Sequence, residues 1–387
     1  MKQRMINTFF RITKSAVIAR IMASVCYIVL SVMYAVYKLF LRKKTDLALE
    51  DARKILNECS KKPRMFSEIN NRDSEIDLSI IVPAYNAEST IEKCVESVIQ
   101  QKVSFQYELI IVNDGSTDNT KEIVEKYEDS HIRLINQENR GFSGARNRGI
   151  DEAVGRYFMF LDSDDYLVGN CIEKMLKTMK EQNADVVQGS YFSFDEEKGT
   201  KQISSLKKRI IVDDKQQLVA NPGYPWAKIF KKELFDNLRF PLDVWFEDTI
   251  VCMILYRLSK KIIVLDEIVY AYRINYNGIT QKARHNKKCV DHYWVMEFIL
   301  EKSYELKLPN DELQYEMIRS HMSTLLYRRI SLMDKKVIES AFIMASEMLD
   351  KIRPDNYKCK GNFKQKDIER AFVEKKYGLW KAASFVV

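Results

Sequence analysis

Two acidic side chains, Asp162 and Asp164, directly follow the apolar run 158–161. On an extended backbone, residues two positions apart point to the same face, so we expect the two carboxylates to converge. Converging carboxylates repel one another unless a cation lies between them. Carboxylate oxygens suit Mg²⁺ or Mn²⁺, which commonly share them with substrate phosphates. The pair therefore predicts a divalent-cation site. The alternative is that Asp164 or Asp165 only caps the next helix.

Polar residues also follow two earlier apolar runs. Pro83, Tyr85 and Asn86 end the run that begins at Leu78, and Asp114 ends the next one. A carboxylate at position 114 could accept a hydrogen bond from a nucleobase N–H or a ribose hydroxyl. The alternative is that the segment after Asp114 forms only a turn and a helix cap.

Glu247 and Asp248 lie directly after Trp245 and Phe246 and before an apolar segment. The structural alternative is that acidic residues here only interact with the dipole at a helix start. The dipole does not account for the two aromatic side chains that precede them. A carboxylate beside an aromatic surface is suited to accept a proton from a sugar hydroxyl, because aromatic faces contact the C–H groups of sugars.

A repeated order of apolar strands and amphipathic helices must position these clusters. Short β-branched runs predict buried strands, and apolar residues at helical spacing between them predict helices. Strands that alternate with helices form a parallel sheet with helices on both faces, so the fold class is α/β. In such sheets ligands bind outside the carboxyl ends of the strands, which is where the polar clusters lie.

Composition and missing motifs exclude several classes of protein. Hydrophobic residues make up 46% and charged residues 30% of the 387 residues, which excludes wholesale disorder. Neither GxGxxG nor GxxxxGK[ST] occurs, which argues against dehydrogenases and P-loop NTPases. The seven cysteines are too widely spaced for a CxxC zinc module or a dense disulfide scaffold.

The basic charge of the chain is concentrated at its N-terminus. The net charge is +8, but residues 1–44 carry nine basic residues and no acidic one, which leaves residues 45–387 nearly neutral. The uncharged stretch 21–37 is at the lower length limit for a helix that spans a bilayer. We therefore expect a membrane-associated helix that spans the bilayer or lies on anionic lipid. A soluble helix packed on the rest of the protein is the alternative.

Six segments in this order resemble the inverting GT-A glycosyltransferases of family 2. They are IIVPAYNAESTIEKCVESVIQQ, ELIIVNDGSTDNT, NRGFSGARNRGI, FMFLDSDD, PWAKIFKKELF and the FED sequence that ends at Asp248. The resemblance implies a GT-A fold, which is Rossmann-like, with a mostly parallel sheet flanked by helices. It also implies a nucleotide-diphosphate-sugar donor, of which a UDP-sugar is the first choice, and Mg²⁺ or Mn²⁺ as cofactor.

The resemblance also implies roles for individual residues. Asp248 would be the catalytic base with support from Glu247, and Asp164 would be the principal metal ligand. Asp162 would contact the metal or the ribose. The other residues expected to bind the nucleotide-sugar are Pro83, Tyr85, Asn86, Asp114, Arg146 and Ser163. Those expected to border the acceptor are Trp226, Lys228 and Trp245, and for Trp226 and Lys228 a place in the core or on the surface is the alternative.

The implied reaction moves a sugar to an acceptor hydroxyl with inversion, in the synthesis of a cell-surface polysaccharide or a lipid-linked glycan. One alternative is a non-catalytic protein on the same fold that binds nucleotide-sugars or glycans. Another is a sugar-nucleotide pyrophosphorylase, but VPAYNAEST lacks the Gly/Arg-rich loop which that chemistry needs. No basic stripe with interleaved aromatic residues occurs in the folded part, so we expect no nucleic-acid partner.

We expect four parts along the chain: a basic apolar membrane-associated segment (1–44), a stem or linker (45–76), a catalytic GT-A domain (77–287) and a C-terminal helical region (288–387). The C-terminal helices could cover the acceptor side or make a homo-oligomer. The chain contains no Asn-x-Ser/Thr sequon, and nucleotide sugars are made in the cytosol. We therefore expect the enzyme at the cytoplasmic face of the cell membrane.

Overall fold

The computed structural model describes residues 2–38, 45, 47–64, 75–276, 278 and 286–385, which form two compact units. One unit comprises residues 62–282 and 298–308, and the other comprises residues 1–61, 283–297 and 309–387. Part of the expected basic segment, including Arg42, Lys43 and Lys44, lies outside the described residues, so its predicted contact with lipid stays a prediction.

Within the described residues, the first unit contains one ten-stranded sheet. Its strands lie in the order β3-β2-β1-β4-β9-β6-β10-β5, while β7 pairs with β6 and β8 pairs with β10. The strands are β1 (Leu78–Ala84), β2 (Tyr107–Asp114), β3 (Ile132–Gln137), β4 (Tyr157–Phe160), β5 (Tyr166–Leu167), β6 (Val186–Asp195), β7 (Thr200–Ser204), β8 (Arg209–Val212), β9 (Lys228–Lys231) and β10 (Lys261–Arg273).

The sheet is mixed, so the prediction of a mostly parallel sheet is wrong for its second half. Strands β1 to β4 are parallel, as the alternation of strands and helices predicts. Strand β9 is antiparallel to both β4 and β6, and β10 is parallel to β6 but antiparallel to β5 and β8. A short connection explains why β7 is antiparallel to β6, because the four residues between them are too few for the crossover that a parallel neighbour requires.

Helices cover both faces of the sheet. Helices α4 (Ile91–Ile99) and α7 (Cys171–Gln182) share a buried apolar core with Ile80 and Val82 of β1. Helix α6 (Gly141–Glu152) packs against Ile81, whose side chain points to the opposite face. Gly149 permits this close approach, because a methyl group there would lie 2.3 Å from Cγ2 of Ile81. The shorter helices are α5 (Thr120–Val124), α8 (Lys215–Val219) and α9 (Tyr256–Leu258), the last preceded by the π-helical turn Val251–Leu255.

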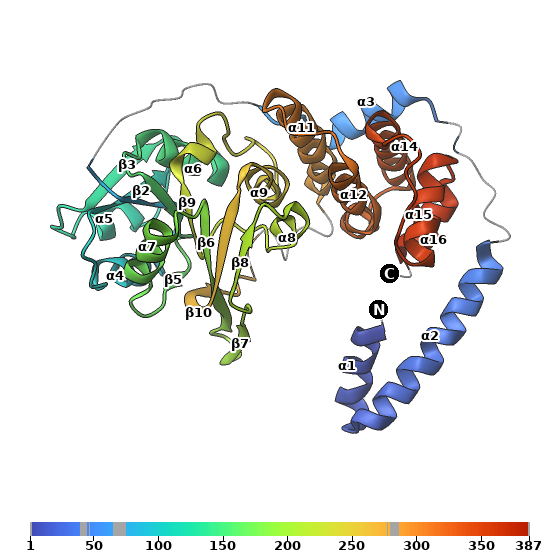
Figure 1. Ribbon diagram of the computed structural model, residues 1–387, viewed down its shortest axis with the longest axis horizontal. Coiled ribbons are helices and arrows are strands. Elements are labelled where there is room, and N and C mark those ends of the chain that lie inside the picture. Colours follow the sequence, from blue (N-terminus) through green and yellow to red (C-terminus); the bar gives the residue numbers. More distant parts are fainter. Residues whose placement is uncertain are drawn as a thin grey trace. The chain divides into compact units, whose positions relative to one another are not determined.

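The second unit is helical in its described residues. Its helices are α1 (Lys2–Thr13), α2 (Ala16–Lys38), α3 (Leu49–Cys59), α12 (Glu312–Ser320), α13 (Leu326–Ile330), α14 (Lys335–Ile352), α15 (Phe363–Val373) and α16 (Tyr377–Phe385), and α11 (Asp291–Glu305) begins in it (Figure 1). The helices expected after residue 288 are therefore present. Helix α3 lies in the segment predicted to be a stem, where it packs against α14 with Ala52 and Leu56 fully buried.

Among the helices that the structure describes, none combines the length and the apolar character required to cross a membrane. Helix α2 nevertheless exposes many apolar side chains, including Ile21, Val25 and Ile28, which are 55–61% exposed.

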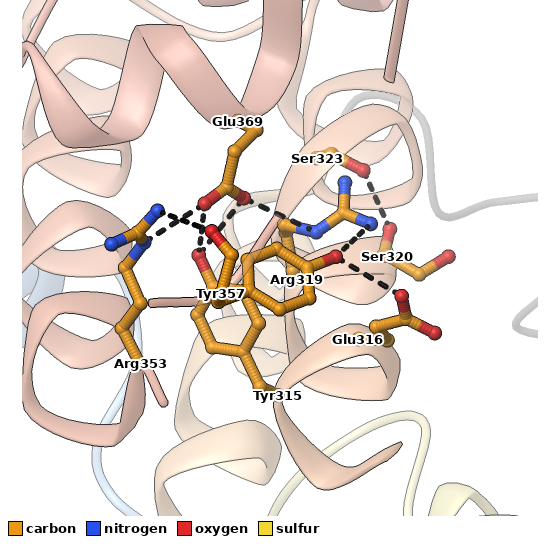
Figure 2. A network of polar contacts seen from close by, with 8 residues as sticks. All are labelled: Tyr315, Glu316, Arg319, Ser320, Ser323, Arg353, Tyr357 and Glu369. Atoms are coloured by element: carbon orange, nitrogen blue, oxygen red, sulfur yellow. Dashed lines mark hydrogen bonds and ion pairs between the residues drawn. The ribbon is translucent and has the colours of Figure 1, made fainter. Parts of the chain in front are cut away.

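A buried carboxylate, Glu369 of α15, connects several segments of the helical unit (Figure 2). It accepts hydrogen bonds from the hydroxyl of Tyr315 at 2.9 Å and from Nε of Arg353 at 2.9 Å. Nε of Arg319 lies 3.4 Å from its other oxygen. Glu369 thereby connects α12 and α15 with the loop that follows α14.

Tyr357 extends this network to a second carboxylate. Its hydroxyl accepts a hydrogen bond from Nη2 of Arg319 at 3.4 Å and donates one to Oε1 of Glu316 at 3.0 Å. Two guanidinium groups, those of Arg319 and Arg353, thus face two carboxylates, and the formal charges of the network cancel (Figure 2).

Replacing Glu369 by Gln should destabilise the helical unit by about 3 kcal/mol, because two guanidinium groups would lose the charge that compensates them. Urea unfolding of the full chain, followed by circular dichroism, measures this change. Glu312→Gln is the matched control, since Glu312 pairs with Lys360 on the surface and its loss should change little. Equal stability of the wild type and Glu369→Gln would refute the central role of Glu369.

Candidate active site

The buried guanidinium of Arg146 joins two acidic segments that lie far apart in the sequence. Its Nη2 donates to Oδ1 of Asp162 at 2.7 Å, and its Nη1 donates to Oε1 of Glu247 at 2.5 Å. Arg146 and Glu247 are only 6% and 5% exposed. The planar guanidinium can donate in two directions at once, which a lysine ammonium cannot do with the same geometry. Arg146 therefore places the turn after β4 beside the segment that holds Glu247 and Asp248.

Helix α6 also fixes the backbone that leads to Glu247. The Asn147 side chain donates to the carbonyl of Phe240 and accepts from its N–H, both at 2.8 Å. One turn further, Asp151 accepts a hydrogen bond from Nε of Arg239 at 2.8 Å. All four residues are buried, so α6 holds the segment 239–247 through three side chains of its own, those of Arg146, Asn147 and Asp151.

Glu247 and Asp248 have different surroundings although they are neighbours. Burial raises the pKa of Glu247 to about 8; the Arg146 guanidinium opposes this shift, and repulsion from Asp248 adds to it. Asp248 is partly exposed. The buried Glu247 therefore serves as the partner of Arg146, while Asp248 is the carboxylate of the pair that a ligand can reach.

The backbone before this pair is strained. Phe246 has a φ of +69°, in the left-handed region that aromatic residues rarely adopt. The turn is closed by a hydrogen bond from the Thr249 N–H to the Phe246 carbonyl at 3.1 Å. The neighbouring Trp245 is partly exposed. Strain of this kind persists only where the surroundings enforce it, and the Arg146–Glu247 contact is one such constraint.

The acidic residues after β4 form a turn, so the predicted extended geometry of Asp162 and Asp164 is wrong. The turn is closed by a hydrogen bond from the Asp165 N–H to the Asp162 carbonyl at 3.0 Å. The two carboxylates nevertheless interact, because Asp162 is one of the charges that raise the pKa of Asp164. Ser163, between them, is partly exposed.

The arrangement of these carboxylates fits a divalent cation that takes further ligands from a substrate. Burial, followed by repulsion from Asp162, raises the pKa of Asp164. Burial, with Asp164 and Asp162 adding, raises the pKa of Asp165 well above its usual value. A cation near Asp162 and Asp164 would offset this excess of negative charge. No cluster of three or more His, Cys, Asp and Glu side chains that could hold a metal occurs among the described residues. Phosphate oxygens and water would complete the coordination of such an ion.

Hydrogen bonds join the loops that follow β1 and β2. Asn86 has a φ of +48°, which Asn tolerates better than most residues. Its N–H donates to Oγ of Ser116 at 3.0 Å, and its Oδ1 accepts from the Thr117 N–H at 2.8 Å. The next N–H along the chain, that of Ala87, donates to Oγ1 of Thr120 at 2.7 Å. The two predicted nucleotide-binding loops thus form one surface.

Three further residues expected to bind nucleotide lie at this edge of the sheet. Asp114 is 2% exposed, and its Oδ1 accepts from Nε2 of Gln137 at 2.6 Å and from the Arg140 N–H at 2.8 Å. Pro83 is buried within β1, whereas Tyr85 is 53% exposed. Tyr85 is therefore the member of this set with most surface available to a ligand.

The residues expected at the acceptor differ in accessibility. Trp226 is 8% exposed and stacks on Tyr224 at a centroid distance of 3.7 Å and on Tyr270 at 4.7 Å. Lys228 is fully buried, and its Nζ donates to the carbonyls of Tyr224 at 2.6 Å and Trp226 at 3.3 Å. Both side chains therefore lie in the core, which is the alternative given above to a place beside the acceptor. Trp245, in contrast, is partly exposed.

Sequence reasoning missed the residues at the end of β10 and just after it that contact the acidic turn. Tyr270, Arg273 and Asn275 all donate hydrogen bonds to residues of this turn. Their spacing from Asp162 offers no signal. Strand β10 runs in the same direction as β1 and β4, so its carboxyl end lies at the same edge. The strand-end rule would have found them if the direction of β10 had been known.

Comparison with known proteins identifies the family of the chain. Residues 79–239 match the family described as Glycosyl transferase family 2. The glycosyltransferase EpsJ of Bacillus subtilis is 32% identical over 244 residues, which cover 60% of this chain and 68% of EpsJ. The chain belongs to glycosyl transferase family 2. A second relative, the glycosyltransferase GlyA of Streptococcus pneumoniae, is 35% identical over 219 residues, which are 53% of this chain but only 31% of GlyA.

A solved structure supports the GT-A-like fold of this family member. Residues 1–349 of TarS from S. aureus, in complex with UDP-GlcNAc, align with a TM-score of 0.61. The alignment covers 80% of this chain and 91% of the TarS chain at 20% sequence identity. At that identity the likeness shows the fold alone.

The raised pKa of Glu247 predicts a pH-dependent stability. A carboxyl group with a folded-state pKa near 8, against its usual 4.5, binds its proton more tightly when the protein is folded. The free energy of unfolding should therefore fall as pH rises from about 5 to about 8, by up to about 1.4 kcal/mol per pH unit. In Glu247→Gln this part of the slope should vanish. Urea unfolding at several pH values measures it, and identical slopes in both proteins would contradict the assignment.

Proposed function

We propose that this protein transfers a sugar from a UDP-sugar to an acceptor hydroxyl with inversion, using Asp248 as the general base. The observation that carries the proposal is the contact of the Arg146 guanidinium with both Asp162 and Glu247. It places a partly exposed carboxylate beside an acidic turn at the carboxyl edge of the sheet. Two chemical tasks meet there, proton removal from an acceptor and stabilisation of a leaving diphosphate.

The donor would bind across the loops after β1, β2 and β4. Tyr85 has an exposed ring for a base, and Asp114 has a buried carboxylate for a polar group of the nucleoside. Asn86 holds the first two of these loops together. TarS, which shares the fold, has been solved with UDP-GlcNAc, and this supports a UDP-sugar as the donor class.

Asp164 and Asp162 would hold Mg²⁺ or Mn²⁺, which would supply positive charge at the diphosphate. The support for this assignment is the excess of carboxylates in the turn and the raised pKa of Asp164, caused first by burial and then by Asp162. Arg146 already pairs with Asp162, so Asp164 is the carboxylate with more capacity to act as a ligand.

Inversion follows from a single displacement. Asp248 takes the proton from the acceptor hydroxyl while the acceptor oxygen bonds to the anomeric carbon. The bond between that carbon and the diphosphate oxygen breaks, and UDP leaves with the electron pair. Attack from the face opposite the leaving group inverts the anomeric configuration. No side chain forms a covalent intermediate in this scheme.

Asp248→Asn should lower sugar transfer by about a hundredfold or more, because the acceptor would lose its general base. UDP binding, measured by calorimetry, should stay close to that of the wild type. Asp243→Asn is the matched control, since Asp243 lies in the same segment and pairs with Arg64 at the surface. Undiminished transfer by Asp248→Asn, with a panel of UDP-sugars, would refute the role of Asp248.

We also propose that the N-terminal helices place this enzyme on anionic lipid at the cytoplasmic face of a membrane, where it extends a cell-surface polysaccharide or a lipid-linked glycan. Half of the large apolar side chains that are exposed among the described residues lie on α1 and α2. They are Phe10, Ile12, Val17, Ile18, Ile21, Met22, Val25, Ile28, Val29 and Val32. The absence of acidic residues from 1–44 complements an anionic surface.

The exposed residues of α2 form one stripe. Ile18, Ile21, Val25, Ile28 and Val32 alternate in spacing between three and four positions, which places them on one helix face. Ala19, Ala23 and Tyr34 of the same helix are buried. An apolar stripe backed by basic charge is typical of helices that lie in a lipid interface.

Replacing Ile21, Val25 and Ile28 together by Asp should weaken binding to phosphatidylglycerol-containing vesicles by about tenfold or more. Vesicle flotation measures this, with pure phosphatidylcholine vesicles as the test of charge. The control carries Asp at Ile203 and Ile210, which are equally exposed in the other unit. Binding that the triple substitution leaves unchanged would refute the proposal. If the stripe instead forms the interface of a homo-oligomer, light scattering should show that wild-type chains associate, and they should not bind vesicles.

A further inference from the structure

The hydroxyl of Tyr270 connects the two ends of the acidic turn. It accepts a hydrogen bond from the Asp162 N–H at 3.2 Å and donates one to Oδ2 of Asp165 at 2.8 Å. Tyr270 is fully buried, and Asp165 is 1% exposed. Asp162 and Asp165 are also joined directly, by the backbone hydrogen bond from the Asp165 N–H to the Asp162 carbonyl that closes the turn.

The chain after Tyr270 binds the remaining parts of the turn. The Arg273 N–H donates to Oδ1 of Asp165 at 2.7 Å, and its Nε donates to the Asp164 carbonyl at 2.7 Å. Nδ2 of Asn275 donates to Oδ2 of Asp164 at 3.2 Å. In each of these three contacts, a donor group of Arg273 or Asn275 faces an oxygen atom of the turn.

The turn requires such donors because it is electrostatically unfavourable by itself. It contains three carboxylates in four consecutive residues, and like charges at this spacing repel. The Tyr270 ring cannot move to follow the turn, since it stacks on Trp226 at 4.7 Å and its backbone is paired with Leu167 of β5. The hydroxyl is therefore a fixed point to which the turn is attached.

We propose that Tyr270 is a positioning residue, whose hydroxyl holds Asp162 and Asp165 and thereby fixes the turn that presents Asp162 and Asp164 to a divalent cation with the donor diphosphate. Asn275 contributes to the same task by orienting the Asp164 carboxylate. This inference rests on the proposed function, and it adds a residue that touches neither the substrate nor the reacting atoms.

Calorimetric titration of UDP at a series of Mn²⁺ concentrations tests this proposal. In Tyr270→Phe the ring and its stacking stay, but both hydrogen bonds of the hydroxyl are lost. The Mn²⁺ concentration that gives half-maximal enhancement of UDP binding should rise about tenfold, as expected for the loss of a hydrogen bond to a charged group. UDP binding without Mn²⁺ should be unchanged.

Tyr107→Phe is the matched control, because Tyr107 begins β2 at the opposite edge of the sheet and should keep the wild-type Mn²⁺ dependence. Unchanged Mn²⁺ dependence in Tyr270→Phe would overturn the inference. Equal weakening of UDP binding with and without Mn²⁺ would overturn it too, since that points to general disruption. A wild type whose UDP binding does not respond to Mn²⁺ would instead overturn the proposed cofactor.

Asn275→Ala provides a second test that does not depend on a buried substitution. Asn275 is exposed, so the variant should fold like the wild type. It loses the contact with Asp164, and its Mn²⁺ requirement should rise by about threefold. A Mn²⁺ requirement equal to that of the wild type would remove Asn275 from the proposal. A wild-type Mn²⁺ requirement in both Asn275→Ala and Tyr270→Phe would refute the whole proposal.

Discussion

The contact of one buried guanidinium with two carboxylates is the constraint on which the site depends. Arg146 lies on a helix that Gly149 allows to approach the central strand, and it reaches Asp162 and Glu247 from there. Without it, the buried Glu247 and the partly exposed Asp162 would both lose a compensating charge, which is costly for a group in a protein interior. The position of Asp248 follows from this contact, because Asp248 is adjacent to Glu247 in the chain.

Both units use buried guanidinium–carboxylate contacts, but with opposite charge balance. In the helical unit, two arginines face two carboxylates and the network around Glu369 is neutral. In the unit that contains the sheet, Arg146 faces Asp162 and Glu247, while Asp164, Asp165 and Asp248 lie nearby. The formal charges of the first network cancel among its own side chains. The second has more negative charge than its protein cations balance, which is the condition under which an ionic ligand improves the electrostatics of a site.

The sequence predicts the first half of the sheet well, because the runs at 78–84 and 107–114 are continuous, apolar and followed by polar residues. It predicts the acidic clusters for the same reason. It does not predict the antiparallel strands, since short connections and tertiary pairing determine their direction. The contact of Arg146 with Glu247 spans 101 positions and has no local signal. Lys228 illustrates the limit for single side chains, because a lysine suggests an exposed surface and here its ammonium is satisfied by buried carbonyls.

The hydrogen bonds between the loops after β1 and β2 have a consequence for ligand binding. Asn86, Ala87 and Glu88 each donate a backbone N–H to a side chain of the segment after β2, so hydrogen bonds of the chain itself hold the two loops together. Ordering a loop upon binding costs conformational entropy, and a surface assembled in advance avoids that cost. A nucleotide that binds there meets a rigid receptor. The affinity of these loops should therefore depend on the complementarity of their surface rather than on an induced change of shape.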